Sequence, residues 1–183
     1  MSVGESSADL AILGDAFSRR SLARRASTLA RVHLAQLNIA KLVDDPDSPT
    51  VAEFMAALPA INLLGESSPG FVWRLADENG PGAIDQRFPG HEDDPRLIVN
   101  MTVWEDFASL RHFVSRSGHA IYLRRRLEWF EKSGVAKNVL WWIEDGHRPT
   151  LDEAADRLAT LRANGATEGA FDMATPFPEP VSS

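Results

Sequence analysis

The sequence contains no cysteine, which excludes disulfides, thiolate nucleophiles, cysteine-based zinc sites and iron–sulfur clusters. No apolar run approaches the roughly 20 residues that a membrane-spanning helix needs, so no membrane partner is predicted. Basic residues are in the minority, 19 against 26 acidic ones. The resulting net charge of −7 argues against a nucleic-acid partner.

Several catalytic and cofactor motifs are also missing. The chain has no glycine-rich phosphate loop, no GxSxG nucleophile elbow and no HExxH pair. Its carboxylates and histidines do not cluster at metal-ligand spacing, so no metal site is expected.

The remaining composition is that of one ordinary globular domain: 183 residues, 44% of them apolar and 25% charged. Residues 1–31 carry five arginines but lack the apolar periodicity of the rest. They indicate a flexible N-terminal extension to a domain over residues 32–180. A transit peptide or a helix lying on a membrane surface is the alternative for this extension. The lack of cysteine and of a secretory signal favours a cytoplasmic protein.

Hydrophobic periodicity predicts four strands and four helical segments. Alternation, or a continuous apolar run in the last case, predicts strands over 33–39, 71–75, 97–103 and 138–143. Helical spacing predicts helices over 50–61, 106–114, 119–131 and 150–164. Thr50 and Thr150 each begin a capping box. Asp106 can cap the second helix, and Pro59 should kink or shorten the first.

The order of these elements is that of a split βαβ unit. It predicts an α+β, ferredoxin-like fold: a four-stranded antiparallel sheet with helices on one face and an extra C-terminal helix. The last strand is apolar on both sides, so the second face of the sheet must also be covered. A second copy of the same sheet is the simplest cover and gives a dimeric α+β barrel. The predicted dimer face carries Ala35, Leu37, Val99 and Met101.

A set of short stretches resembles a known family. They are HLAQLNI at 33–39, SPGFVWRL at 68–75, VNMTVWE at 99–105, residues 113–119 and 123–130, LWWI at 140–143, GHRPT at 146–150 and PFP at 176–178. Together they resemble a bacterial family of unknown function in the dimeric α+β barrel superfamily, which includes the antibiotic-biosynthesis monooxygenase-like proteins. The resemblance covers about residues 32–180 and implies this fold and a homodimer. It implies no particular reaction, because the family is poorly characterised.

Polar residues of one parity on the sheet form the first candidate site. The resemblance implies that Gln36 and Asn38 face the helices, where active superfamily members hold their substrate. Asn100 and Thr102 have the same parity on their strand, and Arg74 is a further candidate on the neighbouring strand. Polar groups on a helix-covered face are costly unless they bond one another or a ligand. The prediction is a polar-lined pocket for a small organic molecule; the alternative is that these groups face water.

His119 is the candidate catalytic residue. It begins a helical segment, and Tyr122, Arg126 and Trp129 follow on the same helix face as candidate substrate-binding residues. A histidine pKa of about 6.5 suits a general base, and a helix N-terminus favours the neutral imidazole. The resemblance supports this role, because monooxygenase-like relatives often carry a histidine at this place. The alternative is a histidine that bonds to the preceding chain break or lies in water.

Three further features concern the surroundings of this pocket. Trp104, at the pocket's edge, is a candidate for stacking on an aromatic ligand. His147, at the tip of the last strand, is a candidate second base or ligand contact, with hydrogen bonding inside its own loop as the alternative. The stripe formed by Leu123, Leu127 and Phe130 is expected to be core.

Three functions follow from the resemblance and these residues. The first is an enzyme without a cofactor that acts on an aromatic or polyketide-like molecule, whose anion reacts with oxygen or undergoes cyclisation or isomerisation. In it, His119 removes a proton while Asn38 and Asn100 hold the substrate oxygens. The second is a haem-dependent enzyme, for which Asn38 matches but the expected tryptophan and histidine fall on Phe113 and near Leu123. The third is a ligand-binding dimer with no catalytic activity.

Overall fold

The computed structural model describes residues 31–76 and 86–180. The chain divides into two units, Met1–Arg31 with Ser182–Ser183, and Val32–Val181. Every element below belongs to the second unit. The flexible extension predicted over residues 1–31 lies outside the described residues, apart from Arg31, and stays a prediction. None of the helices in the described ranges has the length and apolar character that crossing a membrane requires.

The four predicted strands are all present. They are β1 (Val32–Lys41), β2 (Phe71–Arg74), β3 (Leu97–Trp104) and β4 (Asn138–Glu144). They form one antiparallel sheet in the order β2-β3-β1-β4, so β1 and β3 occupy its centre. This order confirms the predicted α+β, ferredoxin-like fold.

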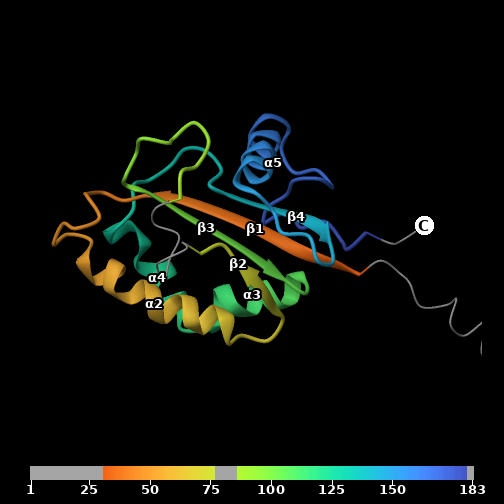
Figure 1. The fold of residues 1–183 in the computed structure, drawn as a ribbon, viewed down its shortest axis with the longest axis horizontal. Coiled ribbons are helices and arrows are strands. Elements are labelled where there is room, and N and C mark those ends of the chain that lie inside the picture. The colour runs from red at the N-terminus through yellow and green to blue at the C-terminus, as the bar shows by residue number, and fades with distance from the viewer. Residues whose placement is uncertain (1–30, 77–85, 181–183) are drawn as a thin grey trace, which may run out of the picture. The chain divides into compact units, whose positions relative to one another are not determined.

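Helices cover both faces of the sheet. On one face lie α2 (Ala52–Glu66), α3 (Phe107–Arg116), α4 (His119–Arg125) and a short 3-10 turn, η1 (Arg126–Glu128), whereas α5 (Leu151–Asn164) lies on the other (Figure 1). On the α3 side, Leu34 and Trp104 of the sheet pack with Leu110 and Phe113 of the helix. Even-numbered residues of β1 therefore face α2, α3 and α4, and odd-numbered ones face α5.

The expectation that a second copy covers the other sheet face is wrong. Ala35, Leu37, Val99 and Met101 are almost completely buried within one chain. They share a core cluster with Ala154, Leu158 and Leu161 of α5 and with Phe88, which lies in the loop before β3. The C-terminal helix supplies the apolar surface that the dimer was expected to supply. A homodimer remains a prediction of the resemblance, but the buried parts of this face are not available to form it.

Two of the three predicted helix caps are present in the structure. Asp106 Oδ1 accepts a hydrogen bond from the Ser109 amide at 2.7 Å, and Thr150 Oγ1 accepts one from Glu153 at 3.2 Å, as predicted. Thr50 is different, because its hydroxyl donates to Asp44 at 3.0 Å and α2 begins without a side-chain cap. The helix α2 also continues through Pro59, which was expected to kink or shorten it, so the helix is not shortened there.

Candidate functional site

A cavity of about 910 Å³ lies between the sheet and the helices α2, α3 and α4. This volume is within the range of small-molecule sites. The sheet contributes polar side chains to its wall, and α2 contributes apolar ones such as Phe54, Leu58 and Ile61. Of the predicted site residues, the structure brings nine to this cavity: Gln36, Asn38, Arg74, Asn100, Thr102, Trp104, His119, Tyr122 and Arg126.

One row of the cavity wall is held by a chain of hydrogen bonds. Gln36 of β1 lies opposite Thr102 of β3. Thr102 Oγ1 donates to Gln36 Oε1 at 2.7 Å and accepts from Trp104 Nε1 at 2.9 Å. Because an indole nitrogen can only donate, the hydroxyl hydrogen of Thr102 is directed to Gln36. The amide oxygen of Gln36 is thus occupied, and its NH₂ group remains to donate toward the cavity.

Arg74 closes this row at the edge strand. It lies opposite Thr102 on β2 and lines the cavity. Its Nε donates to Glu66 Oε1 at 2.5 Å, and its Nη1 donates to the Leu75 carbonyl at 3.2 Å. The ion pair ties β2 to the C-terminal end of α2, so the guanidinium is a fixed part of the wall.

A second row consists of three asparagines. Asn38 of β1 lies directly opposite Asn100 of β3 on one side and Asn138 of β4 on the other. All three line the cavity and are neither fully buried nor fully exposed. Among the described residues, none of the three side-chain amides has a hydrogen-bond partner. Each therefore keeps a donor and an acceptor for whatever occupies the cavity.

His119 lies on the helical wall of the same cavity, where α3 ends and α4 begins. Its backbone amide donates to Ser117 Oγ at 3.1 Å, and its ring packs on Phe113 with centroids 4.9 Å apart. Burial of the imidazole lowers its pKa below the ordinary value, opposed by a contact with the Val114 carbonyl. That carbonyl, 3.5 Å from Nδ1, can only accept. The contact therefore favours a proton on Nδ1 and leaves Nε2 as the basic nitrogen.

Tyr122 and Arg126 also line the cavity, as predicted from their spacing after His119. The Tyr122 ring lies 6.0 Å from the ring of Trp129, and Arg126 Nη1 donates to the Leu123 carbonyl at 3.0 Å. Leu123 and Leu127 were expected to be core, and this is wrong. They are 39% and 51% exposed, and both line the cavity.

The cavity is richer in cations than the chain as a whole. Arg126, Lys132 and Lys137 line it, and within the described ranges none of the three forms an ion pair. Its lining acids are Glu131, which is paired with Arg96 at 3.2 Å, and Asp172. In a chain of net charge −7, this lining favours an anionic ligand.

Trp104 lines the cavity but does not offer the stacking surface that was expected. Its side chain is completely buried. One ring face stacks on Phe113 with centroids 5.1 Å apart, and Phe71 meets it edge-on at 5.5 Å. Its contribution to the site is the indole N–H that orients Thr102.

The structure does not bring Trp129 to the cavity, where the sequence predicted a ligand contact. Trp129 is buried against Phe54 of α2, with ring centroids 5.8 Å apart, and Arg125 lies 4.7 Å over its ring. The reason is the change from α4 to the 3-10 turn η1 at Arg126, which rotates the following residues away from the face that His119 begins.

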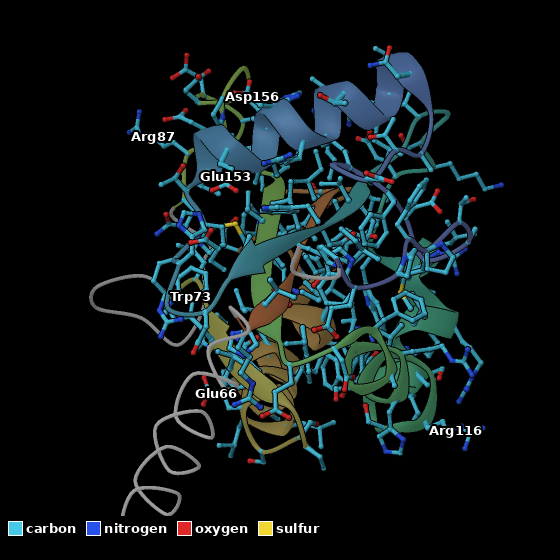
Figure 2. All side chains as sticks on the ribbon, turned by 90° about the vertical axis from the view of Figure 1, so that its right-hand side faces the viewer. Glu66, Trp73, Arg87, Arg116, Glu153 and Asp156 are labelled. Atoms are coloured by element: carbon cyan, nitrogen blue, oxygen red, sulfur yellow. The ribbon has the colours of Figure 1, made fainter. Side chains whose placement is uncertain are left out.

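His147 is also outside the cavity, on the α5 side of the sheet. Its Nε2 lies 2.7 Å from Glu153 Oε2, and Trp141 Nε1 donates to the other carboxylate oxygen at 2.8 Å. Figure 2 shows Glu153 on α5 and Glu66 on α2, on opposite sides of the sheet. The ring is therefore hydrogen-bonded to the first turn of α5, just beyond the loop within which the alternative prediction expected its partner.

Two residues of the site were missed or left unassigned by the sequence. Asn138 was recognised only as the start of a strand, although it extends the asparagine row. Arg74 was a further candidate without a partner, and its pairing with Glu66 depends on the fold. As to metal ions, the described part of the chain contains no group of three histidine or acidic side chains placed to hold one.

Comparison with known proteins gives a family and several distant structural similarities. The family model of DUF3291, described as a domain of unknown function, matches residues 33–183. No curated protein sequence matches the chain.

Among solved structures, a protein of unknown function from Nitrosomonas europaea, NE2512, is similar with a TM-score of 0.41 and 11% identity, over 66% of this chain and 96% of its own. SnoaB from Streptomyces nogalater, a cofactor-independent oxygenase, is similar with a TM-score of 0.37 and 17% identity, over 65% of this chain and 96% of its own. PA3566 from Pseudomonas aeruginosa is similar with a TM-score of 0.41 and 10% identity, over 67% of this chain and 100% of its own. At these scores the similarity says nothing about function, and the fold is established by the chain's own sheet.

Proposed function

Because the chain belongs to the DUF3291 family, a domain of unknown function, we propose a function from the cavity itself. The chain binds a small aromatic or polyketide-like molecule there and oxygenates it without a cofactor. The observation that carries this proposal is the position of His119, a histidine with a lowered pKa, in the same cavity as the polar rows of the sheet.

The first step is removal of a proton from an acidic O–H or C–H of the ligand by Nε2 of His119. The lowered pKa keeps this nitrogen unprotonated near neutral pH, which a general base requires. The oxygen that gains charge can accept hydrogen bonds from Asn38 and Asn100. Arg126, Lys132 and Lys137, which form no ion pair with any described residue, further favour the anion.

The second step is reaction of the electron-rich anion with dioxygen. One oxygen atom forms a new carbonyl on the ligand, and the other leaves as water with the two hydrogens that the ligand loses. The ligand thus loses two hydrogen atoms and gains one oxygen atom, which is a four-electron oxidation. Dioxygen takes up these four electrons and is fully reduced, so no other reductant is needed. The apolar wall formed by Phe54, Leu58 and Ile61 keeps water away from the anion.

The haem-dependent alternative fits the cavity less well. Haem iron needs an axial ligand, and His147 is paired with Glu153 of α5, which lies on the opposite side of the sheet from the cavity (Figure 2). Phe113 and Leu123 cannot ligate iron. His119 is then the histidine that remains on the cavity wall, and its ring is already packed on Phe113.

Oxygen uptake with naphthoresorcinol as probe substrate tests the proposal. Oxidation of this electron-rich naphthalenediol by one dioxygen yields lawsone and one water, which balances atoms and electrons. We expect the protein to accelerate lawsone formation over buffer, and His119→Ala to lower that acceleration by about 100-fold. The matched control is His112→Ala, because His112 is exposed on α3 and does not line the cavity.

Two results would contradict the proposal. If the protein does not accelerate oxygen uptake, the cavity is a binding site or catalyses an isomerisation instead. If His119→Ala and His112→Ala retain the same rate as the unaltered protein, His119 is not the base.

A further inference from the structure

The asparagine row has a spacing fixed by the sheet. Asn38, Asn100 and Asn138 lie at directly paired positions on three neighbouring strands. Neighbouring strands are about 4.8 Å apart, so consecutive amides of the row are separated by roughly that distance. Because the backbone ladder holds the register, this spacing belongs to the fold and not to flexible side chains.

The row is also free to bind a ligand. Its amides line the cavity and have no hydrogen-bond partner among the described residues. The neighbouring row differs, because Gln36, Thr102 and Trp104 bond one another there. Gln36 also lines the cavity, and its NH₂ group has no hydrogen-bond partner among the described residues, so both rows offer N–H donors to a ligand. Such a wall suits a ligand that carries several oxygen acceptors.

The spacing selects among arrangements of those oxygens. Two oxygens on adjacent carbons of an aromatic ring lie within hydrogen-bond distance of each other, which is too close for amides on separate strands. Two oxygens in the meta relationship are farther apart, by close to one strand spacing. Each oxygen of a meta pair can then bond to its own asparagine.

We propose that the row of Asn138, Asn38 and Asn100 binds a meta-dioxygenated aromatic ring through two neighbouring amides. This inference rests on the proposed function, because it requires a small molecule in the cavity. Asn38 is the central member, and it belongs to both possible pairs. Its amide is therefore needed whichever pair the ligand uses.

Calorimetric titration without oxygen tests this proposal by binding alone. The probes are naphthoresorcinol, whose hydroxyls are meta, and the isomeric naphthalenediol with hydroxyls on adjacent β carbons. The two have the same atoms and nearly the same apolar surface. We expect naphthoresorcinol to bind about fivefold more tightly, which is the effect of one additional hydrogen bond.

Asn38→Leu keeps the approximate volume of the side chain and removes the amide. We expect it to bring the affinity ratio of the two isomers close to one. If Asn38→Leu does not fold, the double variant Asn100→Leu with Asn138→Leu leaves one lone amide and should give the same ratio. The matched control is Asn62→Leu, which changes an amide on α2 outside the row and should keep the isomer preference.

The outcomes separate this inference from the proposed function. Equal binding of the two isomers, or a preference that survives both the Asn38→Leu change and the double variant, would overturn the role of the row while leaving a ligand in the cavity. If neither isomer binds, the proposed function fails and the inference fails with it.

Discussion

Thr102 of β3 donates its hydroxyl hydrogen to Gln36 of β1 at 2.7 Å, across the centre of the sheet. Both residues are nearly buried, and Thr102 also accepts from the completely buried Trp104. One hydroxyl therefore satisfies two buried groups and fixes the orientation of an amide on the cavity wall.

Replacing Thr102 by valine should destabilise the protein by about 1–3 kcal/mol, because it leaves the Trp104 N–H and the Gln36 oxygen without partners. Urea unfolding measures this change. Thr160→Val is the matched control, since Thr160 is only half-buried on α5 and, among the described residues, its hydroxyl donates to the Asp156 carbonyl alone. It should change the free energy of unfolding by less than about 0.5 kcal/mol. Equal effects of the two substitutions would contradict the role given to Thr102.

The buried imidazole of His119 predicts a pH dependence of stability. Its pKa in the folded chain is lowered, so the unfolded chain takes up this proton at a higher pH than the folded chain does. The free energy of unfolding should therefore decrease as the pH falls below about 6.5, the ordinary value for histidine. The contribution of His119 to this decrease should end once the pH lies below the lowered pKa of its imidazole in the folded chain.

Urea unfolding at a series of pH values measures this effect against a variant that cannot titrate. His119→Gln should flatten the slope below neutral pH, and the exposed His112→Gln should flatten it less. A slope that is the same in His119→Gln and in the unaltered protein would show that His119 is not held in its neutral form.

Because α5 covers one face of the sheet, its buried Leu158 should be essential for stability. Leu158→Ala should cost about 2–5 kcal/mol, because Leu158 is buried between α5 and the sheet. Leu63→Ala on α2 is the matched control, since Leu63 is 62% exposed and should change stability by less than about 0.5 kcal/mol. Thermal or urea unfolding compares the two. A small effect of Leu158→Ala would mean that α5 does not cover this sheet face in solution.

Hemin titration tests the alternative cofactor. We expect only the broad spectrum of non-specific binding, because the histidines that could ligate iron are unsuitable. His147 is paired with Glu153, and His119 is packed on Phe113. A sharp Soret band at one haem per chain, abolished by His119→Ala, would contradict this expectation.

Much of the fold could be predicted because the strands alternate with period two. Parity placed Gln36 and Asn38 on one face of the sheet, and the resemblance implied that this face is the cavity side, where both residues lie. Asn138 was missed for a physical reason. It begins a continuous apolar strand, whose own pattern does not define its register against β1.

The errors arose where tertiary structure decides the direction of a side chain. The apolar stripe of α5 was visible in the sequence, but which sheet face it covers was not, and so a second copy was expected there. The helical period was extended from His119 to Trp129, whereas the chain changes to a 3-10 turn at Arg126. That change exposes Leu127 and buries Trp129 against α2.

The asparagine row as a ligand site is tested most directly by nuclear magnetic resonance of the side-chain amides themselves. With heavy nitrogen introduced only into asparagine, oxygen-free addition of naphthoresorcinol should shift the NH₂ signals of Asn38, Asn100 and Asn138. Asn164, exposed at the end of α5, serves as the internal control and should not move. Saturable shifts confined to the asparagines of the cavity are the predicted result. Unchanged signals from the row, or equal shifts of Asn164, would contradict the account.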